Sequence, residues 1–296
     1  MTPRACAALA AALAAIAIAV AVVISPAASA PPAPAPPPTP APSPALAPPV
    51  APPVAPVEFE LADASVSPRR AYVAGRRIAI AFTVRAAAPL DLRVELVREA
   101  TGRVVRGFAL PAVAPGVAQR VAWDALTDRG EVAPAGGYRV RVTAPGAVAH
   151  LAGTLTLRGH IYPIRGPHAD RGPIGRFGVG RSGGRTHEGF DVNAACGTKL
   201  VAARGGRVVR AVYDPVLYGN LVIVRGAHTK RDYWYAHLLR TPRWRAGDRI
   251  STGQRIGSIG ATGNARTIGC HLHFEIRRNG TPIDPEPELH AWDGWS

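Results

Sequence analysis

The chain has 296 residues, 47% of them hydrophobic, with 31 Gly and 30 Pro, so it is long enough for about two domains. Its formal net charge is +15, and its 35 basic residues are all Arg except Lys199 and Lys230. Such a basic chain favours polyanionic surroundings, for example an anionic cell-wall polymer. Because no long Lys/Arg run with interleaved aromatic residues is present, the sequence argues against nucleic acid as a partner.

The first 30 residues have the order of a secretory signal. Arg4 precedes an apolar run over residues 5–24, and a stretch of small residues ending at Ala30 follows. The run is also just long enough to span a bilayer. Residues 1–30 are therefore predicted to be either a cleaved signal peptide or a signal anchor that holds the chain to the membrane through residues 5–24. In both cases the remaining chain is expected in the cell envelope or outside the cell.

Residues 31–56 form a Pro/Ala-rich linker, in which 14 of 26 residues are Pro. A segment of this composition builds no core and stays extended, at about 3.1 Å per residue. We expect it to hold the following domains away from the membrane.

Residues 57–158 contain short alternating stretches with Gly and Pro at the breaks: RRIAIAFTVR, LDLRVELVRE and GYRVRVTAP. This spacing predicts a small antiparallel β-sandwich. The stretch WDALTDRGEVAPAGGYRVRV resembles the Ig-like domain of flagellar-hook-capping proteins, through Trp123-Asp124, Gly130, Pro134 and Gly137-Tyr138. No reactive cluster lies here, so we expect an Ig-like domain with a spacer or wall-contact role.

Residues 159–296 predict a second all-β domain. The stretches GGRVVRAVY, YGNLVIVRG and RAGDRISTGQRIGSIGATG indicate strands and tight Gly turns, without a long helix. The third stretch is also similar to half of a lipoyl-carrier hairpin, but the lysine that a carrier needs is absent from it. Seven of the nine histidines lie beyond His160, which places the chemistry in this domain.

Four histidines occupy patterned positions. RTHEGFDV places His187 and Asp191 four residues apart, YWYAHLLR contains His237, and GCHLHFEI contains His271 and His273. Strand side chains alternate, so the last two share one face of their strand. The first stretch begins like a His-Glu-x-x-His zinc helix, but Gly189 and the missing second His argue against that motif. Glu188 is therefore not expected to be its general base.

Two imidazoles on one strand face indicate a metal or catalytic site, because both would repel when charged and need partners when neutral. A catalytic zinc takes three ligands from His and carboxylate and keeps a fourth position for water. Asp191, together with histidines from among His187, His271 and His273, can supply such a set. The isolated histidines are expected to be structural; they are His150, His160, His168, His228 and His290.

The C-terminal stretches together resemble the LytM/lysostaphin-type zinc peptidoglycan endopeptidases, in order from about Tyr162 to Leu289. The stretches are GGRTHEGFDVNAACGTKLVAARGGRVV, YGNLVIV, YAHL, AGDRISTGQRIGSIGATG and GCHLHFEIRRNGTPIDPEPEL. The resemblance implies an antiparallel β-sheet peptidase domain that hydrolyses peptide bonds in the stem or cross-bridge of peptidoglycan.

The resemblance also implies the residue roles. One zinc per chain is held by His187, Asp191 and His273, while His237 and His271 are the catalytic histidines that do not bind metal. His271 is then expected to move the proton of the attacking water to the leaving amine, and His237 to stabilise the oxyanion. Asn220 and Tyr235 are placed in the substrate groove from their position alone.

Some domains of this type have lost ligands and act as non-catalytic, wall-binding regulators of other hydrolases. Because all five functional positions are present here, we favour an active enzyme. The sequence does not select among a glycine bridge, a D-Ala to diamino-acid cross-link and other stem-peptide bonds.

The two cysteines beyond the signal segment are predicted to form a disulfide. Cys270 lies one residue before His271 and three before His273, and Cys196 lies five residues beyond Asp191. In an extended chain, an odd number of residues separates opposite faces, so both cysteines face away from the metal side. An exported protein folds where disulfides persist. We therefore expect a Cys196–Cys270 bond.

Overall fold

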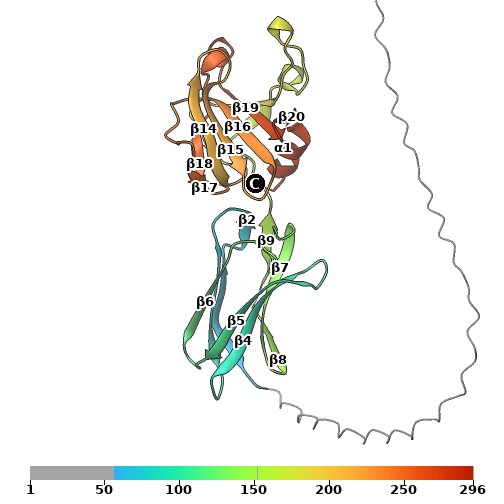
Figure 1. The fold of residues 1–296 in the computed structure, drawn as a ribbon, viewed down its shortest axis with the longest axis vertical. Coiled ribbons are helices and arrows are strands. Elements are labelled where there is room, and N and C mark those ends of the chain that lie inside the picture. The colour runs from blue at the N-terminus through green and yellow to red at the C-terminus, as the bar shows by residue number, and fades with distance from the viewer. Residues whose placement is uncertain (1–56, 152, 296) are drawn as a thin grey trace, which may run out of the picture. The chain divides into compact units, whose positions relative to one another are not determined.

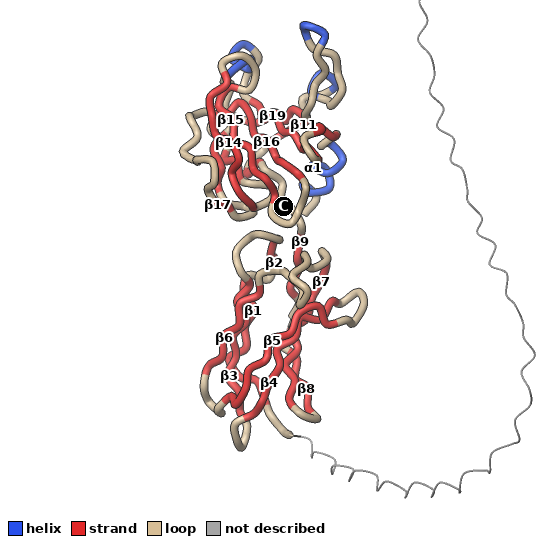
Figure 2. Tube along the Cα trace, in the orientation of Figure 1, coloured by secondary structure: helices blue, strands red, loops and turns tan. Residues whose placement is uncertain are grey.

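The computed structural model describes residues 57–151 and 153–295. The predicted signal or anchor (1–30) and the Pro/Ala-rich linker (31–56) lie outside the described residues. Within the described ranges, no helix is long and apolar enough to cross a membrane. Strands dominate the described chain, and helical segments are few and short (Figure 2).

Residues 57–158 form two sheets. The first has the order β1-β3-β6, with β1 (Glu60–Ser67), β3 (Ile78–Arg85) and β6 (Ala118–Trp123). The second has the order β2-β9-β7-β4-β5, with β8 added to β7. Its strands are β2 (Arg70–Tyr72), β4 (Leu90–Arg98), β5 (Val104–Val113), β7 (Gly136–Ala144), β8 (Ala147–His150) and β9 (Leu155–Arg158).

One hydrophobic core joins the two sheets of this domain. Alternation along β3 buries Ile78, Ile80, Phe82 and Val84, and the same period buries Tyr138, Val140 and Val142 on β7. The rings of Trp123 and Tyr138 meet edge to face, with centroids 5.1 Å apart. The domain is thus a sandwich, as the alternation predicted. One detail differs from the predicted antiparallel sandwich: β2 and β9 pair in parallel. The finer Ig-like assignment stays a prediction.

Residues 159–295 are also mostly β. The large sheet has the order β11-β12-β19-β16-β15-β14-β17, with β20 on β19, and every pair in it is antiparallel (Figure 1). Its strands are β11 (His168–Asp170), β12 (Phe190–Ala194), β14 (Gly206–Asp214), β15 (Gly219–Gly226), β16 (Arg231–Leu238), β17 (Arg249–Ile250), β19 (His271–Arg278) and β20 (Thr281–Ile283). A second, three-stranded sheet contains β10 (Ile164–Arg165), β13 (Lys199–Val201) and β18 (Arg255–Ser258).

The small sheet and α1 (Glu286–Asp293), the one α-helix among the described residues, bury one face of the large sheet. Leu272, Phe274 and Ile276 of β19 point into this core. By alternation, His271, His273 and Glu275 point to the other face, yet they are also buried. The site therefore lies on the face of β19 that turns away from the hydrophobic core.

Three short 3₁₀ segments complete the described elements: η1 (Pro173–Gly175), η2 (Ser182–Gly184) and η3 (Gly263–Thr267). The first two belong to residues 171–189, the long connection from β11 to β12. Gly175 packs in this connection where a Cβ would lie 3.1 Å from the Cβ of Asp191. A larger residue there would push the connection away from β12.

Candidate functional site

The side chains of His187, Asp191 and His273, the set that the family resemblance implies, converge in the structure. Asp191 on β12 is the direct cross-strand partner of His273 on β19. His187 precedes β12, and its N–H donates to the Val179 carbonyl at 2.8 Å. His187 Nε2 lies 3.1 Å from Asp191 Oδ1 and 2.9 Å from His273 Nδ1, while His273 Nδ1 lies 3.0 Å from Asp191 Oδ1. All three side chains are buried.

The outer nitrogen of each imidazole has a different partner, which fixes the tautomer. His187 Nδ1 lies 2.8 Å from the Arg176 carbonyl, so this nitrogen carries the proton and donates it. His273 Nε2 lies 2.9 Å from Glu275 Oε1 and donates in the same way. In the neutral rings the inner nitrogens therefore present lone pairs, and they do so beside a carboxylate oxygen of Asp191. Three acceptors about 3 Å apart fit a bound cation, with a second sphere of the type found around metal-bound histidines.

The pKa shifts of Asp191 and His273 also indicate that this site stabilises a positive charge. Burial by itself would raise the pKa of Asp191, but the close contacts of its carboxylate with the imidazoles of His187 and His273, when these carry a proton, outweigh burial and hold that pKa well below its usual range. Burial would lower the pKa of His273, yet the carboxylates of Asp191 and Glu275 raise it to about 9. The contact between the Asp191 carboxylate and the imidazoles contributes to both shifts, and Glu275 adds to the shift of His273 from the other side of its ring.

His271 and His237 line the same cleft without belonging to the triad. His271 Nδ1 donates to the Gly269 carbonyl at 2.9 Å, and His237 Nδ1 donates to the Thr262 carbonyl at 2.8 Å. Each ring therefore keeps a lone pair on Nε2. Burial, with the neighbouring imidazoles, lowers the pKa of His237 to about 3, and burial also lowers that of His271. Both rings are neutral at neutral pH and can accept a proton.

A β-bulge places His237 on this face. The step from Asn220 to Val222 on β15 is opposite the longer step from Leu238 to Tyr235 on β16, so β16 holds one extra residue. His237 occupies the bulge with a φ of 60°, in the left-handed region. Simple alternation would have put His237 on the side of Tyr235. The bulge instead turns it toward His271, with ring centroids 4.8 Å apart.

The two residues predicted for the substrate groove, Tyr235 and Asn220, lie in the interior instead. Tyr235 is fully buried in the core, and its hydroxyl accepts the Ala203 N–H at 2.8 Å. Asn220 is buried as well; its Nδ2 donates to the Leu238 carbonyl at 3.0 Å, and its N–H donates to Thr262 Oγ1 at 2.9 Å. Neither side chain lines the cleft. Asn220 and Thr262 support the bulge from behind.

The sequence reasoning missed Glu275 and Arg277, which continue the alternating face of β19. Glu275 is fully buried between His273 and Arg277, whose Nε donates to Glu275 Oε2 at 2.6 Å. Arg277 Nη2 also donates to Glu188 Oε2 at 2.6 Å, and its guanidinium lies 4.1 Å from the Trp234 ring centroid. Glu188 is thus an ion-pair partner of Arg277. The period of two that identified His271 and His273 would have identified both missed residues.

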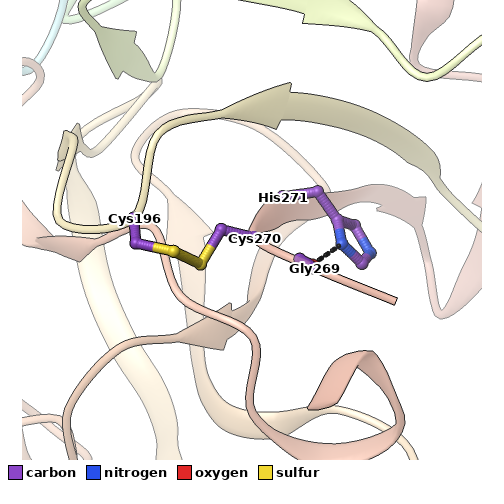
Figure 3. The surroundings of a disulfide bond; sticks show 4 residues. All are labelled: Cys196, Gly269, Cys270 and His271. Atoms are coloured by element: carbon purple, nitrogen blue, oxygen red, sulfur yellow. Dashed lines mark hydrogen bonds between the residues drawn. A yellow bond between two sulfur atoms is a disulfide. The ribbon is translucent and has the colours of Figure 1, made fainter. Parts of the chain in front are cut away.

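The predicted disulfide is confirmed. Cys196 and Cys270 are bonded, with their Cα atoms 5.3 Å apart. Figure 3 shows the Cys270 side chain and the His271 ring leaving the chain on opposite sides. The bond ties the loop after β12 to the start of β19, so it links the strands of Asp191 and His273 covalently.

Comparisons with known proteins agree with this site. Residues 185–285 match the model of Peptidase family M23. The chain is 28% identical over 250 residues to the DD-carboxypeptidase/endopeptidase Mpg of Neisseria meningitidis serogroup B, covering 76% of this chain and 55% of that protein. It is 37% identical over 114 residues to the murein hydrolase activator NlpD of Salmonella dublin, covering 38% of this chain and 28% of that protein.

Among solved structures, the catalytic domain of the antimicrobial peptidase lysostaphin from Staphylococcus simulans matches with 30% identity and a TM-score of 0.35, over 39% of this chain and 89% of that one. The chain spans between about a fifth and about half of the length of the curated relatives it matches. The family match covers the histidines and Asp191 of the cleft. Residues 185–285 therefore form a domain of Peptidase family M23.

Proposed function

We propose that this chain is a zinc-dependent endopeptidase that hydrolyses peptide bonds in the stem or cross-bridge of bacterial peptidoglycan. One observation supports this most strongly. Three buried acceptor atoms, from His187, Asp191 and His273, lie beside two further imidazoles whose Nε2 atoms face the same cleft. The family match and the similarity to the peptidoglycan DD-endopeptidase ShyC of Vibrio cholerae support a peptidoglycan hydrolase.

The donor set suits zinc better than calcium or magnesium. Two imidazole nitrogens and one carboxylate oxygen are ligands that zinc prefers, whereas the two hard cations require mainly oxygen. We assign His187 Nε2, His273 Nδ1 and Asp191 Oδ1 as the ligands of one zinc ion. When bound, zinc would supply Lewis-acid chemistry, by acidifying water and polarising a carbonyl.

His271 is proposed as the general base. Its Nδ1 donates to the Gly269 carbonyl, so Nε2 has the lone pair that can accept a proton from the attacking water. The low pKa of the buried ring keeps it neutral and ready to accept. The same nitrogen can then deliver the proton to the amine that leaves.

His237 is proposed to stabilise the oxyanion, and the structure refines what that role requires. Because its Nδ1–H is engaged with the Thr262 carbonyl, His237 can donate from Nε2 only as an imidazolium. Burial opposes that charged form. We therefore expect His237 to take up a proton from solvent water as negative charge develops on the substrate, rather than before substrate binds, and to return it to solvent when the oxyanion collapses.

A second function has one observation in its favour, the similarity to a murein hydrolase activator. A non-catalytic activator of this type would bind the wall and stimulate another hydrolase. It would need neither a metal triad nor two buried imidazoles with free Nε2 atoms. Since this chain has both, we favour hydrolysis.

The cellular setting is proposed from the sequence. Residues 1–30 would export the chain or anchor it, residues 31–56 would space it from the membrane, and residues 57–158 would serve as an Ig-like spacer or wall-contact domain before the peptidase domain at 159–296. The net charge of +15 would favour anionic wall polymers as additional partners.

Digestion of purified walls of defined cross-link chemistry tests the proposal. The zinc-loaded chain should release fragments whose masses identify the bond cleaved, while His271→Ala should release none. An activator would leave the wall intact when alone and would increase fragment release only when a separate murein hydrolase is added. That pattern would replace the hydrolase proposal.

A further inference from the structure

The cleft beside the triad is unevenly charged. It has a volume of about 660 Å³, and three of its lining residues are arginines of the β11–β12 connection: Arg171, Arg181 and Arg185. Its acidic lining residues already have partners. Arg277 binds Glu188 and Glu275, and Asp191 faces the two ligand imidazoles. The cleft therefore presents guanidinium groups in excess of the carboxylates available to them.

Arg171 lies on the His271 side of the cleft. Its N–H donates to the Asp191 carbonyl at 3.1 Å, which anchors its backbone beside a ligand residue. Its Nη1 donates to Asn193 Oδ1 at 3.2 Å. Asn193 is the direct cross-strand partner of His271, and paired residues share a face of the sheet. The guanidinium of Arg171 is thus held next to the proposed base.

Arg181 lies on the Asp191 side. Its Nη2 is 3.5 Å from Asp191 Oδ2, the carboxylate oxygen that is not part of the triad. A guanidinium has five N–H donors in a planar fork, and this single contact leaves most of them available. The side chain is 27% exposed, so the fork lies at the cleft surface rather than in the core.

Two guanidinium groups on either side of a reaction centre match a ligand with a carboxylate. Arg binds carboxylates through paired, charge-assisted hydrogen bonds, which add geometric selectivity to charge attraction. Peptide cross-links between stem peptides have free carboxylates close to the bond that joins them, whereas a glycine bridge has no charged group. A neutral bridge would cover these arginines without pairing them, which is costly.

We propose that Arg171 and Arg181 bind a free carboxylate of the substrate and so select anionic stem-peptide cross-links over neutral glycine bridges. This inference rests on the proposed function for the identity of the wall peptide, but the recognition itself is a binding property. It can therefore be measured separately from turnover.

The test uses two matched stem peptides, one with its free carboxylates and one with those groups amidated. Binding of each to the full, zinc-loaded chain is measured by calorimetry, and kcat/KM is measured on cross-linked dimers prepared in the same two forms. We expect the carboxylate form to be preferred by about 10- to 100-fold, the range for one charged pair. In Arg171→Gln and Arg181→Gln this ratio should fall toward one. Arg249→Gln, on β17 and outside the cleft lining, is the matched control and should keep the wild-type ratio.

Zinc content is measured for every variant, because Arg181 touches a ligand carboxylate. Arg171 contacts no ligand side chain through its guanidinium, so its variant reports recognition even if Arg181→Gln loses metal. Equal binding of the two peptides by the wild-type chain, or a preference that persists in Arg171→Gln, overturns the inference. Preferential binding that depends on Arg171, in a chain that cleaves neither dimer, supports the inference and contradicts the proposed hydrolysis.

Discussion

Asp191 and His273 are direct partners on the antiparallel strands β12 and β19, with Oδ1 and Nδ1 3.0 Å apart. Neither residue depends on a flexible loop for this approach, because the sheet register itself sets it. His187 is added from the connection, held by backbone hydrogen bonds to residues 178 and 179. Substitution of any of these three proposed ligands is therefore expected to release the metal.

The first prediction concerns the ligands. Alanine at His187, Asp191 or His273 should remove bound zinc and wall lysis together, because three protein ligands are the minimum of a catalytic zinc site. Metal content by mass spectrometry, measured on folded protein, checks this. Stoichiometric zinc in purified His273→Ala would show that the assignment is wrong.

The second prediction separates the catalytic histidines from the ligands. His271→Ala and His237→Ala should each keep zinc but lose about 10²- to 10⁴-fold in turnover, the usual cost of removing a positioned base or oxyanion donor. Zinc titration and wall digestion are run on the same samples. If His271→Ala cannot hold zinc, His271 is a ligand and the roles must be reassigned.

The third prediction concerns Glu275, which accepts the outer proton of His273. Glu275→Gln should weaken zinc binding by about 10- to 100-fold, as loss of a second-sphere carboxylate generally does. Glu188→Gln is a matched control, because Glu188 shares the Arg277 partner but contacts no ligand histidine. Competition with a chelator of known affinity gives the two constants. Equal losses in both variants would instead indicate a general effect of the Arg277 ion pairs.

The fourth prediction concerns the disulfide. It closes a loop of 74 residues, so its removal in Cys196→Ser/Cys270→Ser should destabilise the fold by about 4 kcal/mol on the chain-entropy model. Since the bond links the strands of Asp191 and His273, zinc affinity should fall as well. Calorimetric melting and chelator competition measure the two effects. Exported, denatured and unreduced protein should show no free thiol on labelling, and two free thiols per chain would contradict the bond.

The sequence was informative wherever a period of two applied without interruption. It placed His271 and His273 on one face, turned Cys270 to the other, and predicted strands throughout both domains. It failed at Tyr235, which it placed in the groove with His237, because a one-residue bulge turns His237 to the face opposite Tyr235. Glycine at a position with positive φ can indicate a bulge in a sequence, but here that position is His237, so the sequence gives no such indication. The cleft arginines could not be found either, because their positions depend on the path of a long connection.

The last prediction concerns pH and a histidine outside the cleft. His160 Nε2 lies 2.7 Å from the Tyr233 hydroxyl oxygen, and its ring stacks on Trp292 at a centroid distance of 4.4 Å. Burial, with the charges of two nearby arginines, lowers its pKa to about 3. Below pH 6.5 the unfolded chain therefore binds a proton that the folded chain does not, so the free energy of unfolding falls as the pH is lowered from 6.5 toward 3. This loss of unfolding free energy should approach about 1.4 kcal/mol per pH unit.

The variant His160→Gln tests this. Between about pH 7.5 and about pH 5.5, its unfolding free energy should fall by about 1.4 kcal/mol less than that of the wild type, as measured in denaturant titrations. His228→Asn is the control, because that imidazole is exposed and Asn tolerates its positive φ. If His160→Gln and the wild type lose equal stability over this range, His160 is not the group responsible.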